Sequence, residues 1–220
     1  MQDLEKLTLK TRRREFEDGL FDLSLALILF IVTLPAALLF SSSGLYWYVE
    51  RIIRQREQTL VLIGAIYLLM LAIPFILRMS INHIRKRTFW KESGYTRPLP
   101  LHVSWRVMLS LTMGSIFLIS FAAFGWARGV LTDEHVLKIL PGVTGVATGL
   151  LMMAMGRSLA IARYLWAGGT GALLSVIVVF LPDSPGLAWF FFGVIWLLLM
   201  TISGLSALIP AWRRRVGEEY

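Results

Sequence analysis

Long uncharged stretches dominate the pattern of hydrophobic and polar positions in this chain. Six intervals of 18 or more residues contain no Asp, Glu, Lys or Arg. A helix rises about 1.5 Å per residue, so about 20 apolar residues cross the hydrocarbon core of a bilayer. The pattern therefore predicts an all-α, polytopic integral membrane protein. We place about six transmembrane helices near residues 20–40, 59–77, 107–126, 139–155, 164–181 and 187–209.

Composition agrees with this class. Of the 220 residues, 56% are hydrophobic and 16% are charged, whereas a soluble domain has about 25% charged residues. The segments outside the predicted spans are too short for an appended soluble domain. We therefore predict a single transmembrane domain, with a cytoplasmic amphipathic leader at residues 1–19 and a basic cytoplasmic loop at residues 80–105.

The distribution of basic residues predicts the orientation. Alternate loops on one side hold 17 of the 22 lysines and arginines, and the loops on the other side hold five. The positive-inside rule places the richer side, with both termini, in the cytoplasm. The net charge of +8 then indicates contact with anionic lipid head groups rather than with nucleic acid. We expect a prokaryotic plasma membrane as the location.

Few catalytic chemistries are open to this sequence. It contains no cysteine, which excludes disulfides and thiolate nucleophiles. The three histidines, His83, His102 and His135, lie outside the predicted spans, and a membrane haem generally needs an axial ligand within its helices. No phosphate-binding loop, hydrolase or metalloprotease motif is present. We therefore predict no catalytic residue, metal or cofactor.

Three carboxylates precede or open the first predicted span. Glu15, Asp18 and Asp22 are spaced so that a helix would align them on one face. One interpretation is a substrate, cation or proton site at the cytoplasmic mouth, because carboxylates within a membrane usually have a role. The alternative is an interfacial helix start whose acids complement the helix dipole and pair with Arg12–Arg14 or with arginines of the loops.

Arg157 and Arg163 flank a very short turn between two predicted spans. They could bind a phosphate or carboxylate of a lipid or substrate. They could equally extend to the head groups as ordinary flanking charges. A third possibility is an ion pair with Asp18 or Asp22 across the cytoplasmic face.

Small residues follow one side of each of two consecutive spans. Small side chains let helix backbones approach closely in a membrane, so the simplest interpretation is an antiparallel helical hairpin. A homodimer seam, or an unwound substrate site in the second of these spans, is also possible. The glycines concerned are Gly142, Gly145, Gly149 and Gly156 in one span and Gly168 and Gly171 in the next.

The segment Val49–Glu57 carries three arginines on the predicted outer side. We interpret it as an interfacial helix or as an early extension of the second span.

Three functional classes follow from these patterns. The first is a small transporter or channel-like protein, either as a monomer or as a homo-oligomer, which handles a small molecule, ion or lipid through the inner carboxylates and arginines. The second is a non-catalytic membrane subunit or scaffold that binds a partner membrane protein. The third is a lipid-acting enzyme at the cytoplasmic interface, which would need His83 and His102 near Asp18 and Asp22.

Overall fold

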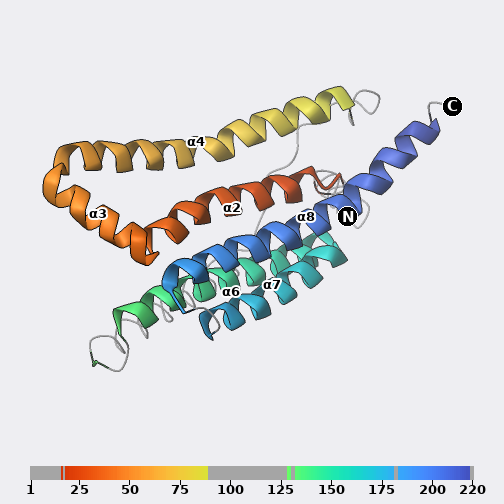
Figure 1. The fold of residues 1–220 in the computed structure, drawn as a ribbon. Coiled ribbons are helices and arrows are strands. Elements are labelled where there is room, and N and C mark those ends of the chain that lie inside the picture. Colours follow the sequence, from red (N-terminus) through yellow and green to blue (C-terminus); the bar gives the residue numbers. More distant parts are fainter. Residues whose placement is uncertain (1–15, 17, 89–127, 130–131, 181–182, 219–220) are drawn as a thin grey trace.

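The computed structural model describes residues 16, 18–88, 128–129, 132–180 and 183–218. Within these ranges the regular structure is helical (Figure 1). The helices are α2 (Leu20–Leu39), α3 (Ser42–Arg54), α4 (Arg56–Thr88), α6 (Asp133–Leu159), α7 (Ala162–Phe180) and α8 (Pro185–Glu218).

Four of these helices are long and apolar enough to cross a membrane. They are Leu20–Leu39, Glu134–Leu159, Ala162–Phe180 and Pro185–Arg213, and they coincide with the first, fourth, fifth and sixth predicted spans. The second predicted span lies on α4, which is not in this set, and residues 107–126 lie outside the described ranges. The described part of the chain is thus helical with four candidate membrane spans, while the count of six and the orientation stay predictions.

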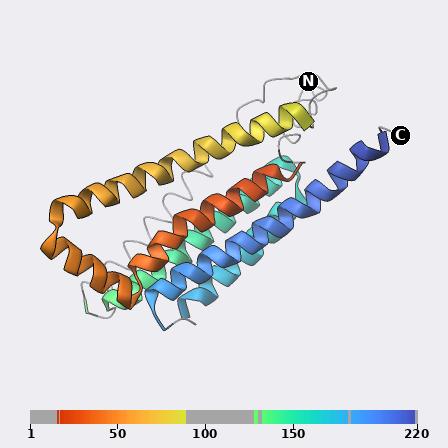
Figure 2. The same ribbon diagram turned by 45° about the horizontal axis from the view of Figure 1, so that its top comes forward.

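The four candidate spans form an antiparallel bundle. Helix α6 packs most extensively on α7, and α2 packs on α8. Both views show α4 standing apart from this bundle, joined to α2 through α3 (Figures 1 and 2). Helix α4 continues to Thr88. The start of the predicted loop at residues 80–105 is therefore helical, and the basic residues near position 85 extend the helix that carries the second predicted span.

Glycines allow the close approach of α6 and α7. A Cβ on Gly168 would lie 2.5 Å from the carbonyl oxygen of Gly149, and a Cβ on Gly149 would meet the Gly168 carbonyl in return. The other predicted seam glycines are also buried against neighbouring helices. Gly142 faces Val179, Gly145 faces Ser175, Gly156 faces Tyr164, and Gly171 faces Trp196 of α8.

The turn between α6 and α7 contains only two residues, Ala160 and Ile161. Ala160 adopts a left-handed conformation with φ 53°, as is common where a helix ends. The backbone N–H of Ile161 donates to the Gly156 carbonyl at 2.9 Å. This bond satisfies one of the carbonyls left open at the helix end and fixes the reversal of the chain.

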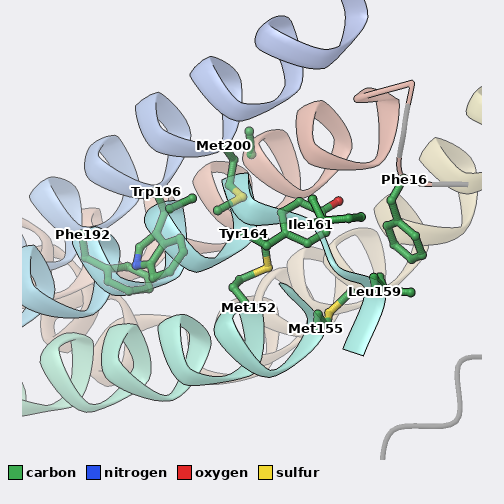
Figure 3. Packing of buried hydrophobic residues seen from close by; sticks show 11 residues of the cluster. Phe16, Met152, Met155, Leu159, Ile161, Tyr164, Phe192, Trp196 and Met200 are labelled. Atoms are coloured by element: carbon green, nitrogen blue, oxygen red, sulfur yellow. The ribbon is translucent and has the colours of Figure 1, made fainter. Parts of the chain in front are cut away.

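Large apolar side chains fill the space between the helices (Figure 3). Trp196 and Phe192 of α8 and Met152 of α6 are buried together with Tyr164 of α7. The indole N–H of Trp196 donates to Ser175 Oγ at 3.2 Å, so the polar atom of this buried ring has a partner. These contacts tie α8 to the α6–α7 pair.

Helix α3 begins after a capped turn. The Ser41 hydroxyl accepts a hydrogen bond from the Gly44 backbone N–H at 3.1 Å, which is a typical N-cap. The helix ends before Gln55, and α4 starts at Arg56. The segment Val49–Glu57 is therefore divided between α3 and α4, and its place at the membrane interface stays a prediction.

Gly19 begins α2 in a left-handed conformation with φ +71°. A Cβ at Gly19 would also collide with the carbonyl oxygen of Gly204 in α8. Both features favour glycine, because it adopts positive φ freely and has no side chain.

We expect Gly19→Ala to destabilise the protein by more than Gly129→Ala. Gly129 has φ +70° but open space around its Cα, so its substitution reports backbone strain alone, about 1–2 kcal/mol. Gly19→Ala adds a collision with backbone. Thermal unfolding of the two variants in the same detergent measures the difference. Equal losses of stability would mean that α2 and α8 are further apart at Gly19 than the contact with Gly204 requires.

Candidate functional site: a buried carboxylate–arginine network

Asp22 lies in the first turn of α2 and is completely buried. Its position follows from the Gly19 turn, which brings the start of α2 against α8. An ionised carboxylate loses its hydration when it is buried, so it needs compensating donors.

Three side chains supply these donors. Arg163 Nε donates to Asp22 Oδ2 at 3.0 Å, and Ser203 Oγ donates to the same oxygen at 2.7 Å. The Tyr164 hydroxyl donates to the other oxygen, Oδ1. Arg163 and Tyr164 come from the start of α7 and Ser203 comes from α8. One carboxylate therefore joins three candidate spans.

Arg163 also binds the segment before α2. Its Nη2 donates to the carbonyl oxygen of Phe16, and its guanidinium lies 5.1 Å from the centre of the Tyr164 ring. The Phe16 ring is buried and makes edge contacts with Phe21 and Tyr164. Figure 3 shows Phe16 beside the end of the bundle that carries Tyr164 and Leu159.

A second ion pair lies just outside the first. Asp18 accepts two hydrogen bonds from Arg85 of α4, from Nε at 2.5 Å and from Nη2 at 2.8 Å. Asp18 Oδ1 also accepts the Leu20 backbone N–H at 3.1 Å, which satisfies one of the free N–H groups at the start of α2. Both partners are buried. This bidentate pair connects α4 to the segment in front of α2.

The two pairs together form what we call the inner network: Asp18, Asp22, Arg85, Arg163, Tyr164 and Ser203. Each carboxylate has its own arginine, so the charges balance. Buried pairs of this kind recover their desolvation cost only with good geometry and further hydrogen bonds, and both are present here. Within the described ranges, no group of three or more His, Cys, Asp and Glu side chains could hold a metal ion.

The structure brings together three of the five predicted site residues. Asp18, Asp22 and Arg163 belong to the inner network, and Asp22 pairs with Arg163, which was one of the open possibilities. Arg157 is exposed at the end of α6 and has no salt bridge to a described residue. Glu15 lies outside the described ranges.

Sequence reasoning named loop arginines as partners of the acids, without singling out Arg85, and it missed Tyr164 and Ser203. Tyr164 follows Arg163 directly, and an aromatic hydroxyl at the start of a span was a usable signal. Ser203 had none, because it is 181 residues from the carboxylate it binds.

Comparison of the chain with protein-family models, with curated proteins and with solved structures finds no match.

Proposed function

We propose that this chain is a small transporter or channel-like membrane protein, and that the inner network closes one end of its pathway. The observation that carries the proposal is the burial of Asp22 within a candidate span, with Arg163, Tyr164 and Ser203 as its partners. Ionisable groups inside a membrane are costly, and they commonly mark the route of an ion or a substrate.

Stability alone does not account for this arrangement. Buried ion pairs can often be replaced by apolar side chains of similar size without loss of stability. An ion pair differs from an apolar contact in that its two halves can separate and be hydrated or bind other ions. Two such pairs, one turn apart, join α2 to α7 and the segment before α2 to α4. Their separation would release two helices at the same end of the molecule.

The alternatives have less support. The predicted seam glycines are buried between helices of this chain, so their surface is not free for a homodimer or for a partner subunit. A lipid-acting enzyme would use Asp18 and Asp22 as acid or base, but both are engaged by arginines. No contact among the described residues favours either alternative over transport.

We expect Asp22→Asn to raise passive ion flux. The Asn side chain keeps the shape but loses the charge that holds Arg163, so the closed state loses part of its advantage. If the substitution destabilises the closed state relative to the open state by about 1.4 kcal/mol or more, the fraction of open protein rises about tenfold or more, as long as that fraction is small. The measurement is KCl conductance in planar bilayers, together with proton flux into dye-loaded liposomes.

The matched control is Glu134→Gln. It removes the exposed acid of an ion pair with Lys138, 2.7 Å long, at the start of α6, and it should leave the flux unchanged. Asp18→Asn serves as a second gate variant in case Asp22→Asn does not fold. If the folded wild type and both gate variants match protein-free membranes with every probe, the transport proposal is wrong. Co-purification of a second polypeptide at a fixed ratio would then indicate a subunit.

A further inference from the structure

Helix α3 lies at the level where α2 and α7 end and α8 begins. It starts at Ser42, three residues after the end of α2. At the same level α8 begins, because the Gly186 backbone N–H donates to the Phe40 carbonyl at 3.1 Å. Helix α7 ends at Phe180, five residues before the start of α8, and Gly142 of α6 faces Val179 near that end, so the first turns of α6 extend past this level. Figures 1 and 2 show α3 crossing from the end of α2 to the start of α4.

An apolar stripe runs along one side of α3. Tyr46, Val49 and Ile53 are spaced at i, i+3 and i+7, so they share a face. Their exposed fractions are 74%, 53% and 78%. A soluble helix would place such a face against its own core. Here it is uncovered, at the boundary of the predicted membrane.

The other side of α3 is polar and charged. Glu50 and Arg54 form an ion pair of 3.2 Å, and the Arg51 guanidinium lies 5.1 Å from the centre of the Trp47 ring. Of these three charges, Glu50 and Arg54 neutralise each other, which leaves Arg51 as the cation available to an anion. A tryptophan with an arginine beside it is typical of the head-group layer.

We propose that α3 lies in the plane of the membrane interface and binds phospholipid there. The stripe of Tyr46, Val49 and Ile53 is immersed among the acyl chains, and Arg51 contacts a lipid phosphate. A helix with an apolar face, a charged face and aromatic side chains binds a bilayer in this way. The ends of the spans at the same level place the stripe at the right depth. This inference is independent of the proposed transport function.

Lipid binding would fix the start of α4. Among the described helices, α4 packs on α2 far less than α8 does. The Asp18–Arg85 pair holds one end, and α3 leads into the other. An anchored α3 supplies the second attachment, through lipid rather than through protein.

The test uses spin labels on single cysteines. Because the chain contains no cysteine, Ile53→Cys and Ser43→Cys each give one labelled site. Ser43 is exposed and lies on the side of Glu50 and Arg54, so it is the matched control. The full-length protein is reconstituted in phosphatidylcholine liposomes, and label collisions are measured with oxygen, which enters the acyl chains, and with a water-soluble nickel chelate.

We expect the label at position 53 to collide severalfold more with oxygen than with the nickel chelate, and the label at position 43 to show the reverse. Equal access of the nickel chelate to both positions would overturn the proposal, because the stripe would then face water. An immobile label at position 53, shielded from both reagents, would also overturn it and would indicate a protein contact such as a second copy of the chain.

Discussion

Replacing Arg163 by methionine is expected to lower the free energy of unfolding by about 3–5 kcal/mol, because the buried Asp22 carboxylate would lose its cation. Asp22→Asn alone should cost less. Asp22 is completely buried, whereas the Arg163 side chain is 22% exposed and can reach water when its partner is neutral. Reversible unfolding in mixed micelles, followed by circular dichroism, measures both changes.

The double variant Asp22→Asn with Arg163→Met distinguishes the energy of the ion pair from the cost of leaving one buried charge without a partner. It should recover much of the stability lost in Arg163→Met, since no uncompensated charge remains. Lys138→Met is the control, because it removes the cation of a pair whose acid, Glu134, is exposed, and it should change stability little. A fully stable Arg163→Met variant would mean that water reaches Asp22.

Gly168→Ala is expected to destabilise the α6–α7 pair, while Gly169→Ala is not. The new Cβ at position 168 would lie 2.5 Å from the Gly149 carbonyl oxygen and 3.0 Å from the Met153 backbone nitrogen. Both are backbone atoms, so the helices must separate, at a cost of about 1–3 kcal/mol or more. At position 169 the nearest atom is Met153 Sδ at 4.0 Å, and alanine gains up to about 1 kcal/mol of helix propensity.

These adjacent substitutions have the same chemistry and differ only in the face they occupy. Thermal unfolding in one detergent gives the comparison directly. The two midpoints should move in opposite directions, with Gly168→Ala below the wild type. Equal midpoints would show that α6 and α7 do not approach as closely as the Gly149–Gly168 contact requires.

The spans were predictable because lipid imposes a simple length requirement. Residues 20–40, which are uncharged after Asp22, and residues 139–155, 164–181 and 187–209 stand out as long apolar stretches, and a helix lies on each of them. The close α6–α7 packing was foreseeable for a related reason. Glycines such as Gly149 and Gly168 stabilise a membrane protein chiefly where they let two helix backbones come into contact.

The α2–α8 contact had a similar signal that went unused. Gly186, Gly193 and Gly204 are spaced by 7 and 11 residues, which keeps them on one face of a helix. In the structure they face α2 and the residues at its ends. The spacing of small residues in α8 could therefore have predicted its neighbour, although not which helix it would be.

Sequence reasoning left the choice of partners within the inner network open. The positions of Asp22 and Arg163 suggested ionic contacts. By residue type alone, however, Arg163 could equally bind a lipid phosphate, bind Asp22 or be hydrated. The choice depends on the Gly19–Gly204 approach, which brings α2 and α8 together near Ser203. That geometry arises from the packing of whole helices and not from any local pattern.

The two-residue turn at Ala160 and Ile161 has a consequence for biogenesis. Helices α6 and α7 are both candidate spans. A turn of two residues is too short to let one helix insert into the membrane well before the other. The backbone contact of Gly149 with Gly168 forms only when both are present. We therefore expect the two helices to enter the bilayer as one hairpin, and we expect a longer turn to uncouple their insertion.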